Sequence, residues 1–521
     1  MKRRIEELVL LAVLAGCLVF IFLDSARFFL RLDLTRSRSN TLSAVTRRIL
    51  GGLSDQVQLT YYLSDTLRSF SPAPGRVIDL LQELAAAGRG RLAVSVLDPE
   101  RTGLTDSARR FGVFPQQIQV FQANEQRTVD VFSGIVLEYL NRYTTLPAVF
   151  TPDGLEFNLS LSIRKLQAGR RISVGVLLGR PGSSLARNFE NLQTGLSRDY
   201  AVHEFLPGEP IPPEVDALLV LGGLGLGADA LRPIDRYLMG GGRILFAVKG
   251  LRVETARTFT AEAAGPSPLL DLIASYGVRV AREMALDTAC RDYRLPQQSG
   301  SQIVWEKLGS YPPWVSIRSP DVSAANPITS DFAGLDLLWP SPLEALPVEG
   351  VQAEALVKTT TSAWTMKEPF VVDPFRMPRS GGAGQRQLVL AYALTGRFSS
   401  RFAPGQGEAS RSPPTRIVVV GDDDFASDLM MFSDSLYNVF FIQNAVLWLS
   451  GQEDLLSIKT RAPGEGRLDR IADPAARSRL MLAAEVLNVG LVPALVILFG
   501  VLRLLGRRER EGRPSARRGR S

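Results

Sequence analysis

The pattern of apolar and polar positions divides the middle of the chain into two kinds of segment. From 57 to 139, apolar and polar residues alternate along short stretches, which is typical of strands buried on one face. From Arg171 onward the strand-like stretches are almost entirely apolar, and stretches with helical spacing separate them. Apolar strands that alternate with helices predict a parallel sheet inside an α/β layer fold.

The first kind of segment predicts the element order β-α-β-α-β-β. Its stretches are QVQLTYYLS, GRVIDLLQELAAAG, RLAVSVLDPE, TDSARRFGV and a hairpin formed by QIQVFQ and TVDVFSGIVLEYL. This order is that of a thioredoxin-like domain, which we assign to residues 32–168. The chain contains no Cys-x-x-Cys pair, so the redox chemistry of that fold is absent. The domain is therefore predicted to be a scaffold or a recognition surface.

The second kind of segment predicts a parallel-sheet domain of the flavodoxin or class I glutamine-amidotransferase type over residues 169–460. Its predicted elements are RISVGVLLG, SLARNFENLQTGLSRDY, YAVHEFLP, DALLVLGG, GADALRPIDRYLMGG, GRILFAVKG, RQLVLAYAL, RIVVVGDDDF and NVFFIQNAVLWLSG. Within this domain, residues 291–347 are rich in Pro, Ser and Trp, which predicts an insertion made mostly of loops.

Two long apolar runs, Leu8–Leu23 and Met481–Leu505, lie near the ends of the chain. A helix needs about 20 apolar residues to cross a bilayer, and basic residues beside such a helix stay on the cytoplasmic side. Basic clusters flank both runs on their outer sides. We therefore predict both termini in the cytoplasm of a bacterium, the spans in its inner membrane, and the bulk of the chain outside the cytoplasm. The predicted segments are a transmembrane signal anchor at 1–31, a linker at 461–480, a transmembrane helix at 481–505 and a basic cytoplasmic tail at 506–521.

The first run also contains Leu14-Ala15-Gly16-Cys17, which matches the bacterial lipobox, a motif whose cysteine is lipidated after cleavage. The apolar run continues beyond Cys17, where a mature lipoprotein would turn polar. An uncleaved anchor is therefore favoured, and lipidation of Cys17 is the alternative.

Composition narrows the function. The chain of 521 residues and 57.0 kDa is long enough for two or three domains with cores of their own. Much of the net charge of +7 lies in the terminal clusters, so nucleic-acid binding is not predicted. Cys17 and Cys290 are the two cysteines and His203 is the single histidine. These residues exclude a disulfide framework, a structural zinc site and most catalytic triads, and no cofactor is predicted.

Ligands of open parallel sheets bind beyond the carboxyl ends of the strands, and three such ends are candidates here. At the first, Gly222 and Gly223 belong to a loose dinucleotide-binding pattern that lacks the expected acidic residue further along. The second ends in Val248-Lys249-Gly250. In class I glutamine amidotransferases the corresponding turn carries a nucleophilic cysteine, and valine cannot take that role. Amidotransferase chemistry is therefore not predicted at this turn.

The third strand end is Gly421-Asp422-Asp423-Asp424-Phe425. Adjacent carboxylates can hold a divalent cation, but successive residues that leave a strand point in different directions. We therefore favour a structural role, in which one aspartate caps a helix that begins near Phe425. No catalytic or metal-binding residue is predicted. The residues kept as a candidate surface for a ligand or partner are Gly222, Gly223, Lys249, Asp422 and Asp424.

Several stretches spread over nearly the whole chain make it similar to a known family. They are LDLTRSRSNTLSAVTRRIL, VDALLVLGG, IDRYLMGGGRILFAVKG, LLDLIASYGVRVAREMALD, RIVVVGDDDFASD and NVFFIQNAVLWLSGQEDLLSIKTR. The chain resembles the GldG-like auxiliary proteins of ABC-type transport systems, a family associated with gliding motility. The resemblance implies a membrane-anchored extracytoplasmic subunit that works with a separate ABC ATPase and a multi-span permease. It transfers no catalytic residue.

The function expected from this resemblance is that of a non-catalytic transport auxiliary. Its extracytoplasmic domains would bind the transported substrate, a polysaccharide or an envelope protein, or would serve only as a scaffold that holds protein partners. The chain has no Gly-x-x-x-x-Gly-Lys-[Ser/Thr] motif, so the partner ATPase must hydrolyse ATP. The alternative is an extracytoplasmic hydrolase or amidotransferase-like enzyme that uses the cluster Asp422–Asp424.

Overall fold

The structure is a computed structural model, and it describes residues 41–459 except 123–124, 255–259, 300–301, 319–320, 331, 333, 379–383, 403–408 and 434–436. The two predicted membrane segments, Cys17, the linker and the basic tail lie outside the described residues. Within the described part, none of the helices combines the length and the apolarity that crossing a bilayer requires.

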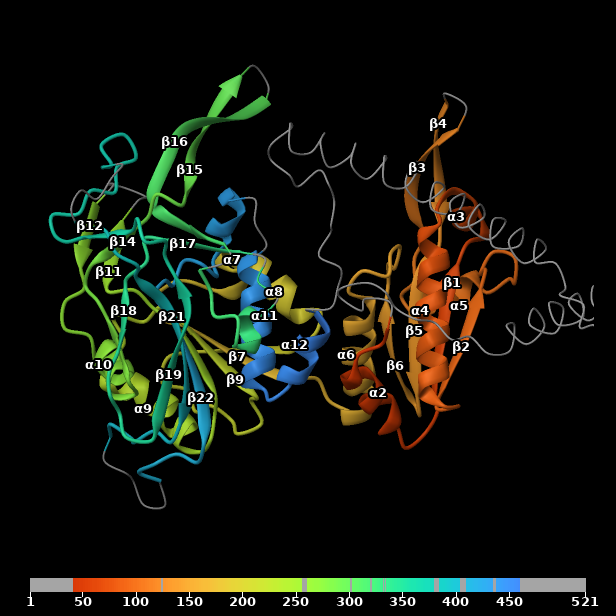
Figure 1. The fold of residues 1–521 in the computed structure, drawn as a ribbon, viewed down its shortest axis with the longest axis horizontal. Helices are drawn as coiled ribbons and strands as arrows, with labels where there is room; N and C mark the ends of the chain where they lie inside the picture. Colours follow the sequence, from red (N-terminus) through yellow and green to blue (C-terminus); the bar gives the residue numbers. More distant parts are fainter. Residues whose placement is uncertain are drawn as a thin grey trace, which may run out of the picture. The chain divides into compact units, whose positions relative to one another are not determined.

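The first part of the described chain is built on a four-stranded sheet in the order β2-β1-β5-β6 (Figure 1). Strand β1 pairs parallel with β2 and antiparallel with β5, which pairs antiparallel with β6. The strands are β1 (Val57–Leu63), β2 (Leu92–Leu97), β5 (Ser133–Tyr139) and β6 (Arg142–Leu146), and the helices are α2 (Ala44–Gly51), α3 (Asp65–Phe70), α4 (Ala73–Gly88), α5 (Thr105–Arg110) and α6 (Leu155–Ala168). Apolar residues of α2, α4 and α6 share one core with β1, as the spacing of Val77, Leu81 and Leu84 along α4 predicts.

The predicted hairpin is present, but its second stretch divides between two sheets. Strand β3 (Gln116–Gln122) pairs with β4 (Glu125–Val131), and β5 leaves this hairpin to join the main sheet. The break falls at Phe132, whose backbone N–H donates to the Ser64 hydroxyl while its carbonyl accepts from the Ser64 N–H. A local pattern of alternation does not reveal this change of partner.

The second part contains a seven-stranded sheet in the order β19-β21-β22-β10-β9-β7-β8. Five neighbouring strands are parallel, in the order β8, β7, β9, β10 and β22 across the sheet. Numbered by their place in the chain, these five parallel strands therefore have the order 2-1-3-4-5. Strand β21 runs antiparallel to both of its neighbours. The strands are β7 (Ser173–Leu178), β8 (Ala201–Phe205), β9 (Ala217–Leu221), β10 (Ile244–Ala247), β19 (Val351–Lys358), β21 (Val389–Gly396) and β22 (Thr415–Val420).

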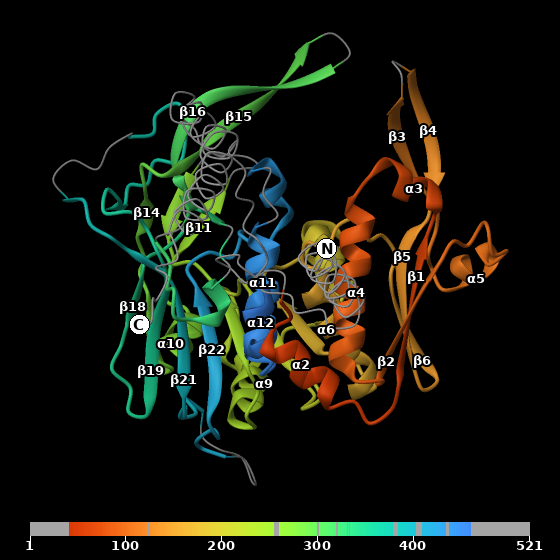
Figure 2. The same cartoon turned by 45° about the vertical axis from the view of Figure 1, so that its right-hand side comes forward.

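Helices cover both faces of this sheet (Figures 1 and 2). On β9, Leu219 and Leu221 belong to the core that contains α8 and α11, whereas Leu218 and Val220 belong to the core that contains α9 and α10. Every side chain of β9 is therefore buried, which is why its sequence is apolar without alternation. The covering helices are α8 (Glu190–Ser197), α11 (Tyr437–Leu449), α9 (Ala228–Met239) and α10 (Pro268–Ser275).

The prediction of a loop-rich segment over 291–347 is wrong, because this segment is largely strand. Strand β16 (Gln302–Ile317) pairs antiparallel with β15 (Cys290–Ser299) and with β17 (Leu335–Leu338). Proline is rare inside strands because it has no backbone N–H to donate to a neighbouring strand. Pro312 and Pro313 nevertheless fit in β16, because they lie where the register between β15 and β16 shifts. The neighbouring short elements are β11 (Leu251–Glu254), β12 (Thr260–Ala263), β13 (Val278–Val280), β14 (Met284–Leu286), η1 (Pro327–Thr329), β18 (Leu343–Ala345) and β20 (Trp364–Met366).

The last described helix, α12 (Glu453–Lys459), contacts α2 and α6 of the first part. Asp454 accepts hydrogen bonds from Arg164 on α6, at 2.8 Å for one of them, and lies 3.0 Å from Nη2 of Arg48 on α2. The apolar core is continuous through these helices. The domain boundary between 168 and 169 stays a prediction.

Candidate functional site

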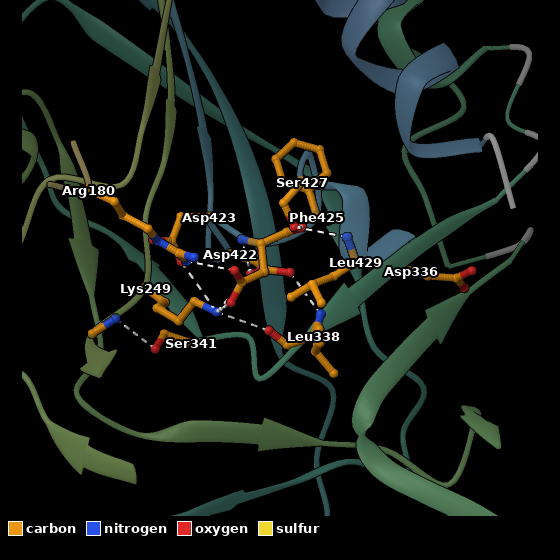
Figure 3. A network of polar contacts seen from close by, with 12 residues as sticks. Arg180, Lys249, Asp336, Leu338, Ser341, Asp422, Asp423, Phe425, Ser427 and Leu429 are labelled. Carbon is orange, nitrogen blue, oxygen red and sulfur yellow. Dashed lines mark hydrogen bonds and ion pairs between the residues drawn. The ribbon is translucent and has the colours of Figure 1, made fainter. Parts of the chain in front are cut away.

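Charged residues that follow three strands of the parallel sheet meet in the structure (Figure 3). Arg180 follows β7, Lys249 follows β10, and Asp422–Asp424 follow β22. The Lys249 Nζ lies 3.1 Å from Asp422 Oδ1, 3.3 Å from Asp423 Oδ1 and 2.5 Å from Asp424 Oδ2. Because parallel strands end at the same edge of a sheet, residues far apart in the chain converge there.

Arg180 supplies a second cation to the three aspartates. Its Nε donates to Asp423 Oδ2 at 3.1 Å, and its Nη2 lies 2.8 Å from the same oxygen and 2.7 Å from Asp424 Oδ1. The Asp422 side chain is 0% exposed and the Lys249 side chain 3%, whereas the Arg180 side chain is 41% exposed. The cluster therefore has a buried part, formed by Lys249 and the aspartates, and an accessible part, formed by Arg180.

The prediction that one of the aspartates caps a helix beginning near Phe425 is wrong. Among the described residues after Phe425, the first helical turn is η3 (Asp428–Ser433), a short 3₁₀ segment, and α11 begins at Tyr437. The Asp422 carboxylate instead accepts hydrogen bonds from the Leu338 N–H at 2.7 Å and the Asp424 N–H at 2.8 Å. The Asp422 carboxylate thus satisfies two backbone N–H groups, and the three carboxylates together balance the charges of Lys249 and Arg180. A buried ammonium group needs such negative charge nearby.

Trp339 packs against Lys249. Its ring centroid lies 5.5 Å from the Lys249 Nζ, and its Nε1 donates to the Tyr311 hydroxyl at 2.8 Å, which fixes the ring. The Lys249 Nζ also donates to the Leu338 carbonyl at 3.2 Å. Lys249 is therefore held by charge, by hydrogen bonds and by a cation–π contact at once.

The pKa values of Asp422 and Asp424 are shifted in opposite directions. Burial, together with repulsion from Asp424 and Asp423, raises the pKa of Asp422 to about 6 although Lys249 opposes this shift. Burial also disfavours the charged form of Asp424, but Lys249 and Arg180 outweigh it and lower the pKa of that carboxyl. As the pH falls, Asp422 thus takes up a proton before Asp424 does.

The aspartates do not fit a resident metal ion. One oxygen from each of the three lies within 4.8 Å of the others, which is a spacing that a cation could bridge. The Lys249 ammonium, however, contacts all three carboxylates and already supplies the positive charge there. A divalent cation would have to displace this buried ammonium group from all three carboxylates.

The glycine turn after β9 lies against the loop after β7. Gly222 has a φ of 78° and Gly223 a φ of 119°, in the left-handed region that glycine tolerates. A Cβ atom on Gly179 would lie 2.3 Å from both the Cα and the N of Gly223, so the two backbones touch. The structure thus brings Gly222 and Gly223 beside Arg180, and Lys249, Asp422 and Asp424 together within the cluster.

This contact leads to a prediction about Gly179. Changing Gly179 to Ala should lower the free energy of unfolding by about 2 kcal/mol, because the new methyl group meets backbone that has no side chain to move aside. The matched control is Gly225→Ala, where a Cβ atom has nothing within 4 Å. Thermal unfolding of both variants checks the prediction, and equal midpoints for the two would contradict it.

Arg180 and Trp339 were not among the predicted site residues. Arg180 had a usable signal, since LLGRPG is itself the carboxyl end of an apolar strand and the rule that selected the other three strand ends applies to it. Trp339 had none, because it follows β17, outside the parallel sheet. Its place beside Lys249 depends on long-range folding of the 291–347 segment.

Comparison with known proteins gives the family. A model of a family described as ABC-type uncharacterized transport system matches residues 171–447, more than half of the chain. A model of a Domain of unknown function (DUF7088) matches residues 36–138. A protein of Borreliella burgdorferi, named only as an uncharacterized protein, is 21% identical over 529 residues, which cover 98% of this chain and 100% of the relative. The chain therefore belongs to the ABC-type uncharacterized transport system family.

Proposed function

We propose that this chain is a membrane-anchored, non-catalytic auxiliary subunit of an ABC-type transport system, of the GldG-like kind. The observation that carries the proposal is the family match over residues 171–447. The terminal apolar runs with basic outer flanks support anchoring in the inner membrane, with both termini cytoplasmic and the bulk of the chain outside. Its partners would be a separate ABC ATPase and a multi-span permease.

The strand orders support the two proposed domain types. The order β2-β1-β5-β6, with one parallel and two antiparallel pairings, is compatible with a thioredoxin-like domain. The order second, first, third, fourth, fifth among the parallel strands is the flavodoxin-like order. Such domains in an auxiliary subunit would serve recognition, of substrate, a polysaccharide or an envelope protein.

The charge cluster supports a non-catalytic role. A general base or nucleophile needs a free electron pair within reach of a substrate. Asp422 is fully buried, and Asp423 and Asp424 contact Lys249 and Arg180. The arrangement thus favours a structural role for Asp422–Asp424 over a catalytic role in a hydrolase. Replacing all three aspartates would leave Lys249 and Arg180 without compensating negative charge and would destabilise the fold. Loss of activity in that variant would therefore not identify an enzyme.

The proposal is tested by co-purification from the native membrane. The full chain with an affinity tag, extracted in a mild detergent, should retain an ABC ATPase and a permease identified by mass spectrometry. A variant that ends at residue 480 is the matched control, because it keeps the described domains and lacks the second predicted span. We expect the permease to be lost with this control. Recovery of neither partner by the full chain would overturn the proposal.

The predicted topology has its own test. A protease added to intact spheroplasts should cleave the region 41–459 and leave an epitope placed after residue 521 intact. Cleavage of that region only after lysis would place it in the cytoplasm and contradict the proposed location.

A further inference from the structure

A cavity of about 730 Å³ opens beyond the carboxyl ends of β7, β9 and β10. The chain leaves β7 toward α8 on one face of the sheet and leaves β9 toward α9 on the other. Open parallel sheets bind ligands in the crevice where successive connections diverge in this way. The volume lies within the roughly 300–1,000 Å³ range of small-molecule sites.

The charged residues that line the cavity are not equally accessible. Lys249, Asp423 and Asp424 line the cavity but are largely buried, and they contact one another. The accessible cations are Arg180, with 41% of its side chain exposed, and Arg252, with 59% exposed. A ligand inside the cavity therefore meets guanidinium groups, while most of the compensating negative charge lies behind them.

The buried aspartates also orient Arg180. Its Nε and Nη2 bind Asp423 and Asp424, and among the contacts between described residues Nη1 takes part in none. The guanidinium is thus fixed along one side, and two N–H groups remain on the other. Arg252 approaches Glu262 only at 4.0 Å, with both side chains largely exposed. Both arginines keep donors available for an anionic group.

One other acid lines the cavity, and apolar residues supply much of the wall. Glu204 accepts a hydrogen bond from the Leu185 N–H at 3.3 Å, so part of its carboxylate is already used. Leu224, Val253 and Leu429 line the cavity, and Leu206 stands at it with 63% of its surface exposed. Such a wall suits an apolar ligand body, which loses contact with water when it enters.

We propose that this cavity binds a small amphipathic anion, with a carboxylate or phosphate group on an apolar body. Arg180 and Arg252 would receive the anionic group, and the apolar wall would cover the body. The inference deepens the proposed function, since it names the ligand class that an auxiliary subunit would recognise at this site. A cationic ligand is disfavoured because two exposed arginines, Arg180 and Arg252, face one exposed acid, Glu204, while Asp423 and Asp424 already contact cations.

The probes are 1-naphthyl phosphate and 2-naphthoate, with neutral 2-naphthol as the control for apolar binding alone. Equilibrium dialysis against the full chain in amphipol measures each Kd. We expect at least one anion to bind about tenfold more tightly than 2-naphthol, the fold-change that one charge-assisted hydrogen bond provides. The two anions separate a phosphate-type site from a carboxylate-type site.

Arg252→Gln should weaken anion binding about tenfold and leave 2-naphthol binding unchanged. Arg180→Gln should also weaken anion binding about tenfold. The thermal unfolding midpoint of this variant is measured as well, because Arg180 also contacts the buried Asp423 and Asp424. The matched control is Arg279→Gln, which removes an equally exposed arginine paired with Glu344 outside the cavity. Equal binding of all three probes, or equal effects of the Arg252 and Arg279 variants, would overturn the inference. Co-purification with the ATPase and permease would be unaffected by either outcome, so failure here is distinguishable from failure of the proposed function.

Discussion

Replacing Lys249 by Met is expected to lower the free energy of unfolding by about 3–5 kcal/mol, the cost of leaving a buried charge without its partner. The side chain is 3% exposed, and its ammonium lies within 3.3 Å of an oxygen of each of three carboxylates. Methionine matches the length of the side chain, so little volume changes. Three aspartates would then face the single cation Arg180 in a place that water hardly reaches.

Chemical unfolding of the full chain in amphipol, or its thermal midpoint, measures this loss. The matched control is Lys367→Met, because Lys367 is 74% exposed and pairs with Glu283 at 3.2 Å. An exposed pair of this kind contributes about 0–1 kcal/mol. Similar midpoints for the two variants would show that Lys249 does not hold the cluster together.

A second substitution should recover part of the loss. In Lys249→Met/Asp422→Asn, one negative charge leaves with the positive one, and the new amide oxygen can still accept the hydrogen bond from the Leu338 N–H. We expect this double variant to be more stable than Lys249→Met alone. A double variant that is less stable would mean that geometry, rather than charge balance, decides the stability of the site.

The sequence predicted the individual strands better than their partners. Apolar runs such as Ala217–Leu221 and Thr415–Val420 are correctly predicted as strands. A strand that is buried on both faces consists almost entirely of apolar residues, and this is visible in the sequence. At Phe132 one predicted stretch changes from the β3–β4 hairpin to the main sheet, and no feature of the local sequence indicates this change. Pairing depends on contacts between distant residues, which local periodicity does not record.

The same limit applies to the candidate site. The strand-end rule selects Lys249 from one stretch, and Asp422 and Asp424 together from another. The partnership of Lys249 with Asp424 joins residues 175 positions apart, and Arg180 joins Asp423 across 243 positions. The aspartates were therefore interpreted from their nearest neighbours in the chain, which suggested a helix cap. Only the folded sheet shows that their nearest neighbours in space are cations.

As the pH rises from about 4 to about 6, the contribution of Asp422 to the stability of this protein should fall. Its pKa is about 6 in the folded chain, against an ordinary value of about 4 in the unfolded chain. In this window the folded chain holds a proton that the unfolded chain has released, so raising the pH favours unfolding. The total contribution is about 3 kcal/mol, and roughly 2 kcal/mol of it lies between about pH 4.5 and pH 7.

Asp424, the other aspartate of the cluster with a shifted pKa, acts in a different pH window. The pKa of Asp424 is lowered, so its contribution to stability is present above the ordinary aspartate value and is lost as the pH falls below it. The two effects therefore do not overlap above about pH 4.5. Together they make the cluster most stable in mildly acidic solution, with Asp422 protonated and Asp424 ionised.

Asp422→Asn isolates the Asp422 effect, because the variant has no carboxyl group to titrate at this position. We expect the free energy of unfolding of the wild-type chain to fall by roughly 2 kcal/mol relative to that of the variant between about pH 4.5 and pH 7. Titratable groups outside the cluster are the same in both proteins, so their contributions cancel in the difference. A difference that stays constant, or that changes in favour of the wild type, would mean that Lys249 keeps Asp422 ionised throughout.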